Sequence, residues 1–312
     1  MRILVIQFAP AVRDRPVPRF DPSLGTLLAL LRSRGHELAL VGLARHDLVA
    51  LKAALARSLP QLICADIAGV CVDLARRILA HIVRHEFVPI VAGGTYPAVD
   101  PAGCLSLPGV QAVAIGEPDA TLVTYLERIQ NPVAGQVVPG VWLRDERGLA
   151  QPPMPQLVED LDSLPWPERD LFGYAEHVRR TGTAEIAVGR GCPQHCAYCV
   201  NPHVADLYGP QALWVRRRSA ANIMDELDDL RARYQPVRLV RFLDHAFALD
   251  VDWLDEFLGA YVYRCALPFR CHLRLNRTNQ RTVTLLADAG CHQVDLELIS
   301  ASNFIRNEMF QM

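Results

Sequence analysis

The chain has 312 residues, of which 51% are hydrophobic and 21% are charged. Its 32 basic and 34 acidic side chains nearly cancel, leaving a formal net charge of −2. This composition is typical of a globular protein with well-formed cores and room for about two domains. A near-neutral charge argues against broad electrostatic binding of nucleic acid or of an anionic membrane, because few cations are in excess to replace counterions.

No segment is typical of a targeting sequence or a membrane span. The N-terminal apolar run, Ile3–Ile6, is too short for a signal-peptide core. No uncharged stretch approaches the roughly 20 apolar residues that a span needs. We therefore expect a cytoplasmic protein, in which the nine cysteines are thiols, metal ligands or small buried residues rather than disulfides.

Short β-branched runs alternate with helical patterns over residues 2–130. Predicted strands cover Ile3–Ile6, Glu37–Val41, Leu62–Ala65, Val88–Ala92 and Val110–Ile115. Between them, apolar residues recur with helical spacing over Leu24–Leu31, Cys71–Ile82 and Leu122–Ile129. This alternation predicts an α/β fold with a parallel, doubly wound sheet that is covered on both faces.

Two glycine-containing loops follow predicted strands directly. Gly93-Gly94 follows the fourth strand and Gly116-Glu117 follows the fifth. Ligands of doubly wound sheets bind beyond the carboxyl ends of the strands, and glycine lets backbone amides approach a ligand closely. An alternative interpretation is that these glycines only form tight turns. A dinucleotide site is disfavoured, because residues 7–21, after the first strand, contain no glycine.

Residues 136–183 differ from the regions on either side. Val141–Leu143, followed by Asp145–Gly148, predicts a small β-hairpin appended to the sheet domain. The segment after it is rich in proline, which fixes φ and removes a hydrogen-bond donor, so we expect an extended connector. The predicted parts are therefore a sheet domain over residues 1–135, a hairpin and connector over 136–183, and a second domain over 184–312.

The strongest chemical signal is a cysteine loop that follows a short predicted strand, Glu185–Val188. Cys192, Cys196 and Cys199 have the spacing C-x3-C-x2-C behind a glycine-rich start, which suits a loop whose backbone approaches a ligand. Three thiolates on one loop can converge on one metal centre, and thiolates select zinc, copper(I) or iron–sulfur clusters. On a 4Fe–4S cluster they leave one iron without a protein ligand, which is the open position of a catalytic site.

The competing interpretation is a structural zinc site with His195 or His203 as the fourth ligand. Structural zinc usually takes its ligands from C-x2-C pairs or spaced histidines, so this spacing fits it less well. Simple packing of the cysteines fits less well still, because a glycine-rich loop after a strand is a poor place to bury them. The loop therefore favours an iron–sulfur cluster.

With Tyr198 before its last cysteine and Asn201-Pro202 after it, the loop resembles the signature of radical S-adenosylmethionine (SAM) enzymes. The order of parts resembles one branch of that family, in which a cobalamin-binding Rossmann-like domain and a connector like residues 161–170 precede the cluster domain. The resemblance covers nearly the whole chain. It implies a 4Fe–4S cluster on Cys192, Cys196 and Cys199, and cobalamin contacts at Gly93, Gly94, Gly116 and Glu117.

The resemblance also implies a reaction. SAM would chelate the fourth iron, and its reductive cleavage would give a 5′-deoxyadenosyl radical that abstracts hydrogen from an unactivated carbon of a biosynthetic substrate. Methyl transfer involving cobalamin, or a rearrangement, would follow, and an electron donor such as flavodoxin or ferredoxin would be a partner. The protein's share of such chemistry is to position the cofactors and to exclude water.

Residues 184–312 have the pattern of the front of a (β/α) barrel. Further strands are predicted at Leu239–Leu243, Phe269–Leu275 and Val294–Leu298, with helices over 223–234, 254–261 and 283–287. Functional side chains of such barrels lie at the carboxyl ends of the strands. Asp244, His245, Arg274 and Asn276 stand at such positions, with a solvated loop or a structural salt bridge as the alternative for each. The predicted SAM contacts are Tyr198, Asp244, Arg274 and Glu297.

Two features depart from the family pattern. The fourth strand of the family usually reads G-[IV]-E-S-G-S, whereas residues 297–302 read E-L-I-S-A-S, so that Ile299 stands where the SAM-binding glutamate is usual. Glu297 lies on the same face of the strand and is the expected substitute. A six-unit barrel needs about 180 residues, whereas only four units run from Glu185 to Met312. We therefore expect a partner chain that completes the barrel; the alternative is a truncated, non-catalytic remnant or accessory protein.

Two further observations concern cobalt and the other cysteines. The D-x-H-x-x-G motif that supplies an axial histidine in many cobalamin proteins is absent, and the corresponding residues 13–18 read R-D-R-P-V-P. The resemblance therefore implies base-off cobalamin without a histidine ligand. The remaining cysteines lack ligand spacing and are interpreted as small buried residues: Cys64, Cys71, Cys104, Cys265, Cys271 and Cys291.

Overall fold

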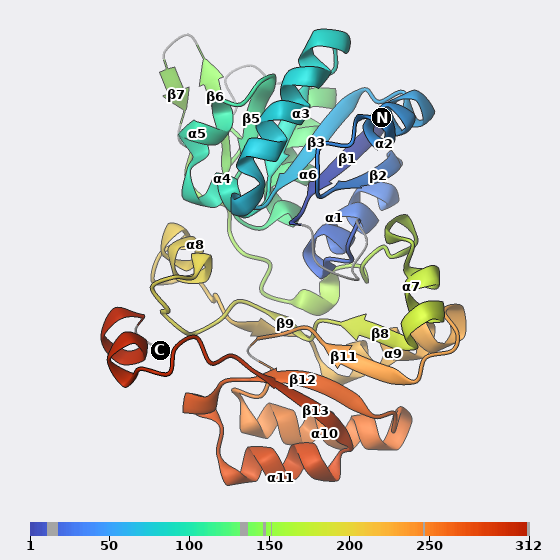
Figure 1. Cartoon of the computed structure of the whole chain (residues 1–312), viewed down its shortest axis with the longest axis vertical. Coiled ribbons are helices and arrows are strands. Elements are labelled where there is room, and N and C mark those ends of the chain that lie inside the picture. Colours follow the sequence, from blue (N-terminus) through green and yellow to red (C-terminus); the bar gives the residue numbers. More distant parts are fainter. Residues whose placement is uncertain (11–17, 132–136, 146–147, 151, 246, 311–312) are drawn as a thin grey trace. The chain divides into compact units, whose positions relative to one another are not determined.

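The computed structural model describes residues 1–10, 18–131, 137–145, 148–150, 152–245 and 247–310 (Figure 1). The chain divides into two compact units. The first consists of Met1–Leu157 with Pro165–Phe172, and the second of Val158–Leu164 with Gly173–Met312. The connector is thus shared, because Val158–Leu164 belongs to the second unit and Pro165–Phe172 to the first. Across the described residues, no helix is long and apolar enough to cross a membrane.

The first unit contains a seven-stranded sheet in the order β2-β1-β3-β4-β5-β6-β7. Strands β1 to β5 are parallel, as predicted, and the hairpin β6–β7 extends the sheet in antiparallel pairing. The strands are β1 (Arg2–Phe8), β2 (Glu37–Leu43), β3 (Leu62–Ile67), β4 (Ile90–Gly93), β5 (Val110–Ala114), β6 (Val141–Asp145) and β7 (Gly148–Ala150). The predicted α/β class and doubly wound topology are confirmed, with the chain reversing its strand order between β1 and β3.

Helices cover both faces of this sheet. On one face, apolar residues of α1 and α6 pack against Ile3, Val5 and Leu62. The alternate strand residues, such as Leu4 and Ile63, are also fully buried, because successive side chains of a strand point to opposite faces. The helices are α1 (Pro22–Ser33), α2 (Leu48–Ser58), α3 (Val72–His85), α4 (Thr95–Val99), α5 (Pro101–Leu105) and α6 (Pro118–Gln130).

Helix α2 was not anticipated from the sequence. Its apolar residues surround the helix and form no clear stripe. The usable signal was its N-cap, because the Asp47 carboxylate accepts a hydrogen bond from the amide of Ala50 at 3.0 Å. The short helices α4 and α5 were missed for a similar reason, since each is a single turn after the Gly93-Gly94 loop.

The second unit contains a four-stranded parallel sheet in the order β13-β12-β11-β8, which confirms the predicted front of a barrel. A separate two-stranded ribbon, β9–β10, precedes and follows the cysteine loop. The strands are β8 (Thr183–Ile186), β9 (Gly189–Arg190), β10 (Arg216–Arg217), β11 (Leu239–Phe242), β12 (Phe269–Leu273) and β13 (Cys291–Leu296). The helices are α7 (Tyr174–Thr181), α8 (Val200–Tyr208), α9 (Ala220–Arg233), α10 (Val251–Arg264) and α11 (Gln280–Asp288).

An aromatic core joins this sheet to its helices. Phe242 of β11 stacks on Phe247 at 4.6 Å between ring centroids and meets Phe257 and Tyr261 of α10 edge-on. All four side chains are fully buried. Helix α9 is capped by Ser219, whose hydroxyl accepts a hydrogen bond from the amide of Asn222 at 3.1 Å.

Candidate functional site

The cysteine loop runs between β9 and α8, and its glycines allow two backbone segments to approach each other. Gly191 has φ +81°, and a Cβ there would lie 2.1 Å from the carbonyl oxygen of Trp214. A Cβ on Gly189 would lie 2.5 Å from the carbonyl oxygen of Arg216. The start of the loop therefore needs glycine because it packs against the segment that leads into β10.

The three thiols of the motif lie in different surroundings. Cys192 and Cys196 are buried, whereas Cys199 is partly exposed and caps α8 by accepting from the amide of Asn201 at 3.5 Å. Burial raises the pKa of the Cys192 thiol, and the neighbouring thiols raise it further, while a hydrogen bond from the Gln194 backbone and the positive charge of Arg274 lower it. The charge of Arg274 thus favours the thiolate of Cys192, against the larger effect of burial.

Within the described residues, no three His, Cys, Asp or Glu side chains are arranged closely enough to hold a metal ion. The donor set nevertheless suits an iron–sulfur cluster, because three thiols stand on one short loop and the other two raise the pKa of Cys192. Their convergence on one centre stays a prediction.

Three of the four predicted SAM contacts lie side by side next to this loop. Arg274 follows β12, and its Nη1 lies 3.3 Å from Oε2 of Glu297, which follows β13. The same guanidinium lies near the Tyr198 hydroxyl, whose pKa burial raises and Arg274 lowers. His245 Nδ1 lies 3.8 Å from the other oxygen of Glu297. The four side chains come from the carboxyl ends of β11, β12 and β13 and from the cysteine loop, as expected for a barrel site.

Asp244 follows β11, but its carboxylate faces the protein backbone. Its two oxygens accept hydrogen bonds from the amides of Val188 and Gly189, each at 2.8 Å. Burial raises the pKa of Asp244 to about 6 despite these bonds and despite the charge of Arg217. The residue therefore fixes the turn between β8 and β9, and its predicted contact with SAM stays a prediction. Asn276 lies exposed in the helical turn after β12.

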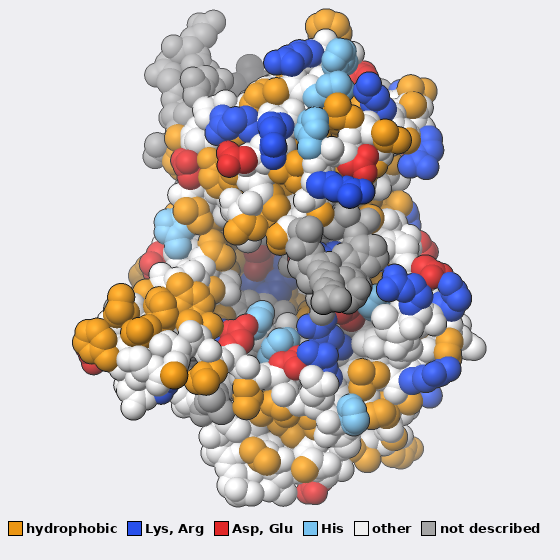
Figure 2. Space-filling view, viewed as in Figure 1, with side chains coloured by type: hydrophobic (Ala, Val, Ile, Leu, Met, Phe, Trp, Pro, Cys, Tyr) orange, Lys and Arg blue, Asp and Glu red, His pale blue; other side chains and the backbone are white. Residues whose placement is uncertain are grey.

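A ladder of ion pairs continues along the same face of the sheet. Arg241 of β11 pairs with Glu185 of β8 at 3.0 Å, and Arg270 of β12 pairs with Asp295 of β13 at 2.6 Å. His272 Nε2 lies 3.7 Å from Asp295. Figure 2 shows acidic, basic and histidine side chains together over this part of the second unit. We missed these residues, although charged residues at every second strand position, as in the run R-C-H-L-R from 270 to 274, were the available signal.

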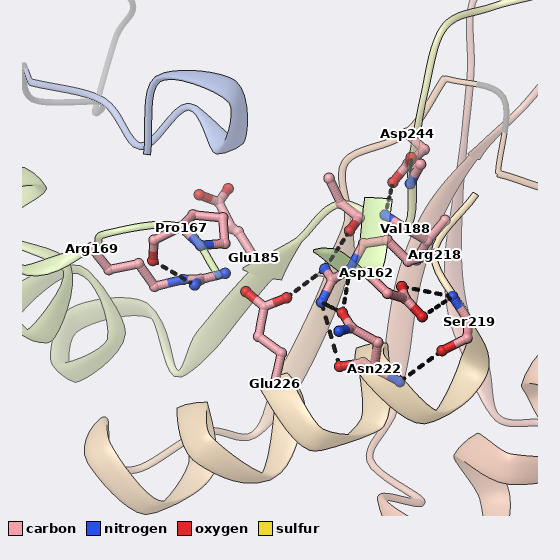
Figure 3. A network of polar contacts seen from close by, with 12 residues as sticks. Asp162, Pro167, Arg169, Glu185, Val188, Arg218, Ser219, Asn222, Glu226 and Asp244 are labelled. Carbon is pink, nitrogen blue, oxygen red and sulfur yellow. Dashed lines mark hydrogen bonds and ion pairs between the residues drawn. The ribbon is translucent and has the colours of Figure 1, made fainter. Parts of the chain in front are cut away.

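A polar network around Arg218 holds the turn that leads into the cysteine loop (Figure 3). The guanidinium of Arg218 donates to the buried carboxylate of Glu226, to Asn222 Oδ1 and, at 3.0 Å, to the carbonyl of Ala187. The connector takes part, because the Asp162 carboxylate accepts from the amide of Ser219 at 3.0 Å. The network thus joins the connector, the start of α9 and the β8–β9 turn.

The glycine loops of the first unit lie at the carboxyl edge of its sheet, as predicted. Gly94 has φ +100°, and a Cβ there would lie 2.6 Å from Oδ1 of Asp66 and 2.8 Å from the backbone of Ile67. Gly93 has open space where a Cβ would stand. Gly94 is therefore required by packing against β3, whereas Gly93 leaves room for a ligand.

The other predicted positions at this edge are Gly116, Glu117 and the loop of residues 13–18. Gly116 has φ +84° between β5 and α6, and the carbonyl of Glu117 accepts a hydrogen bond from the Thr121 hydroxyl at 3.1 Å. Asp66 ends β3 at the switch point beside β1, and burial raises its pKa to about 7. The predicted loop without an axial histidine, residues 13–18, lies outside the described residues except for its last position.

The interpretation of the other six cysteines needs one correction. Five of them are buried as predicted. Cys291 is partly exposed, and its Sγ lies 4.0 Å from that of Cys271. The pairing arises because β12 and β13 are neighbours in the sheet, which sequence spacing alone did not indicate.

Comparison with known proteins supports the radical SAM assignment of the second unit. Residues 186–311 match the Radical SAM superfamily. Over 266 residues the chain is 24% identical to cytidylyl-2-hydroxyethylphosphonate methyltransferase from Streptomyces wedmorensis, a match that covers 75% of this chain and 48% of that protein. The chain therefore spans about half the length of this curated relative.

Two solved structures share the fold across both units. The radical SAM methyltransferase TsrM from Kitasatospora setae, with tryptophan and a SAM analogue bound, has a TM-score of 0.75 at 20% identity, over 98% of this chain and 60% of TsrM. The cobalamin-dependent SAM radical enzyme OxsB, with aqua-cobalamin and SAM bound, has a TM-score of 0.78 at 19% identity, over 99% of this chain and 45% of OxsB. The second unit therefore carries a radical SAM domain, and the chain has the fold of the cobalamin-dependent radical SAM enzymes.

Proposed function

We propose that this chain provides the cofactor-binding domains of a cobalamin-dependent radical SAM enzyme that acts on a small biosynthetic molecule. The observation that carries the proposal is the meeting of Tyr198, Arg274 and Glu297 beside the loop of Cys192 and Cys196, in a domain that matches the radical SAM superfamily. A bound 4Fe–4S cluster would supply the electron that cleaves SAM to a 5′-deoxyadenosyl radical.

The chain's own residues have separable tasks in this proposal. The motif cysteines Cys192, Cys196 and Cys199 bind iron as thiolates, which the positive charge of Arg274 favours. Arg274 and Glu297 offer a cation and an anion side by side, which suits the carboxylate and amino group of the methionine part of SAM. The exposed ring of Tyr198, which packs edge-on against Phe310 at 5.2 Å, shields one side of the loop.

In the first unit, the carboxyl edge of the sheet is the proposed cobalamin site. Gly93, Gly94, Gly116 and Glu117 lie at the ends of β4 and β5, where doubly wound sheets bind ligands. The open space at Gly93 supports a ligand there. Cobalamin is proposed to bind base-off, without a histidine ligand from residues 13–18.

Methyl transfer is the proposed outcome, because TsrM and the Streptomyces relative both carry the name methyltransferase. Their names indicate different substrates, tryptophan and a cytidylylated phosphonate, so no substrate carries over to this chain. The electron donor and a partner chain that completes the barrel stay predictions. The exposed side chains of Val294 and Leu296 on β13, the last strand of the described sheet, favour such a partner and equally the alternative of a non-catalytic remnant.

The test is anaerobic reconstitution with iron, sulfide and cobalamin. The visible spectrum is recorded with and without dithionite and SAM, and 5′-deoxyadenosine is measured by chromatography. A thiolate-to-iron band that dithionite bleaches, together with 5′-deoxyadenosine, supports the enzyme. A stable cluster that never cleaves SAM supports the remnant, and a colourless or zinc-loaded protein overturns the cluster assignment.

Two variants separate the parts of the proposal. Cys196→Ala should abolish cluster formation and SAM cleavage, whereas Cys104→Ala, which removes a buried thiol of the first unit, should retain both. Gly93→Leu should weaken cobalamin binding about tenfold or more by filling the open space, which corresponds to about 1.4 kcal/mol. Gly259→Leu is its control, because Gly259 also has open space but lies in α10. Cobalamin binding unchanged in Gly93→Leu would contradict the site.

A further inference from the structure

A pair of thiols outside the cysteine loop lies on the neighbouring strands β12 and β13. Cys271 is in the middle of β12, and Cys291 is the first residue of β13, so both lie well before the carboxyl ends that carry Arg274 and Glu297. The two strands are parallel neighbours (Figure 1). Their Sγ atoms are 4.0 Å apart, which is hydrogen-bond distance for sulfur.

The two thiols differ in access and in acidity. Cys271 is fully buried, whereas Cys291 is partly exposed. The hydrogen bond between them lowers the pKa of Cys291 and raises that of Cys271, whose pKa burial and the charge of Asp295 raise further. The other titratable groups beside the pair, Cys265 and Tyr261 of the α10 region, are buried. An accessible thiol whose pKa is lowered thus stands beside a buried thiol whose pKa is raised.

This asymmetry is the arrangement of a redox-active dithiol, in which an accessible low-pKa cysteine reacts first and a neighbour resolves it. We propose that Cys291 and Cys271 form a hydroperoxide-reactive dithiol that closes to a disulfide between β12 and β13. The site is independent of the proposed cofactors, since it uses neither the cysteine loop nor the SAM contacts. It also differs from a metal site, because the described residues offer no third ligand in a suitable arrangement.

The proposed reaction balances with a hydroperoxide as the oxidant. The Cys291 thiolate attacks the outer peroxide oxygen, so that an S–O bond forms and the O–O bond breaks. The leaving alkoxide, or hydroxide in the case of hydrogen peroxide, takes up the proton that Cys291 released. The Cys271 sulfur then attacks the resulting sulfenic acid, forming the S–S bond, and the hydroxyl group leaves as water with the Cys271 proton. Two thiols are oxidised by two electrons, and one hydroperoxide is reduced.

Closing the disulfide requires a small backbone adjustment at a place that has the freedom for it. The Sγ atoms must approach to about 2.05 Å. The pairing register between β12 and β13 is already irregular between Phe269 and Arg270, next to Cys271. In the described sheet, β13 is the terminal strand and has a neighbour on one side only. The bond would act on the strand that carries Asp295 and ends just before Glu297, the partners of Arg270 and Arg274.

Peptide mapping tests the proposal on the full chain. The reduced protein is treated with stoichiometric hydrogen peroxide, blocked with N-ethylmaleimide, digested with trypsin and analysed by mass spectrometry. Trypsin places Cys271 in peptide 271–274, Cys291 in peptide 282–306 and the three loop cysteines in peptide 191–216, so a link between Cys271 and Cys291 is distinguishable from any link that involves the loop. We expect a linked 271–274/282–306 species that dithiothreitol removes.

Two variants and one rate measurement complete the test. In Cys271→Ser the linked species should vanish, and dimedone should label a sulfenic acid on Cys291, whereas Cys265→Ser should keep the link. In the unmutated protein at neutral pH, iodoacetamide should alkylate Cys291 at least about tenfold faster than Cys265, which checks without any substitution that Cys291 is accessible and reactive. Equal alkylation rates, or peroxide treatment that links only the loop cysteines, would overturn the proposal.

Discussion

The two sheets of this chain bury their faces differently. In β1 of the first unit, the consecutive residues Ile3 and Leu4 are both fully buried, because helices cover both faces. In β11 of the second unit, Val240 and Phe242 are fully buried, whereas Arg241 between them is in an ion pair on the face opposite α9 and α10. A sheet covered on both faces can offer a ligand only its edge, whereas a sheet covered on one face can offer a surface of charges. This difference explains why the predicted site of the first unit consists of glycine loops, whereas that of the second unit consists of ionisable side chains.

The largest expected effect tests whether each sheet has a core of its own. Phe242→Ala should destabilise the second unit by about 3–5 kcal/mol, and Ile63→Ala should destabilise the first by about 2–5 kcal/mol, because each leaves a cavity at a fully buried site. Hydrogen exchange by mass spectrometry should show each loss of protection confined to its own unit. Loss in both units from either substitution would mean that they unfold together. Tyr263→Ala, at a side chain that is 90% exposed, is the control.

The next effect concerns the close contact between the start of the cysteine loop and the backbone before β10. Gly191→Ala and Gly209→Ala both place a side chain at positive φ, +81° and +83°, which costs about 1–2 kcal/mol in either case. Only the first also drives a Cβ against a backbone carbonyl, that of Trp214, whereas Gly209 has open space. The midpoint of thermal unfolding should therefore fall clearly further in Gly191→Ala than in Gly209→Ala. Iron incorporation should fall only in Gly191→Ala. Equal falls in the two unfolding midpoints would show that the contact between Gly191 and the Trp214 carbonyl does not matter for stability.

A third effect concerns the charged face. Arg241→Met leaves the largely buried Glu185 without its arginine partner, and we expect a loss of about 1–3 kcal/mol in the free energy of unfolding, measured in urea. The double variant with Glu185→Gln should recover part of this loss, because the carboxylate that has lost its arginine is then neutral. Arg179→Met is the matched control, since its pair with Glu176 is exposed and its removal should have a clearly smaller effect. If Arg241→Met and Arg179→Met lower the free energy of unfolding equally, the ion pair on the sheet stabilises the fold no more than an exposed pair does.

The smallest effect is a dependence on pH at the edge of the first sheet. The pKa of Asp66 is raised to about 7 in the folded chain, whereas an unfolded aspartate has a pKa near 3.9. Between these values the folded state keeps a proton that the unfolded state has lost, so this residue makes stability fall as pH rises from about 4 to 7. Asp66→Asn should remove roughly 1 kcal/mol of that fall, since the side chain is only partly buried. Urea unfolding at pH 5 and pH 7.5 measures this change in the free energy of unfolding. The same change in both proteins would contradict the raised pKa of Asp66.

Sequence reasoning performed best where local pattern and tertiary fold agree. The strands of the first unit were predictable because parallel strands buried on both faces are continuous apolar runs. The cysteine loop and the cap at Ser219 were predictable because their signals lie within a few residues. Helix α2 and the ribbon β9–β10 were not, because the first lacks a polar face and the second pairs residues more than 25 positions apart.

Of the proposed site, the sequence by itself determined the residue types at the strand ends and the spacing of the three thiols. It could not determine which side chains meet. The pairing of Arg274 with Glu297, the use of Asp244 as a backbone acceptor and the approach of Cys271 to Cys291 all depend on which strands are neighbours. Strand order and register are set by the burial of each whole sheet against its helices, and that free energy is a sum over the core of the unit rather than a property of any short segment.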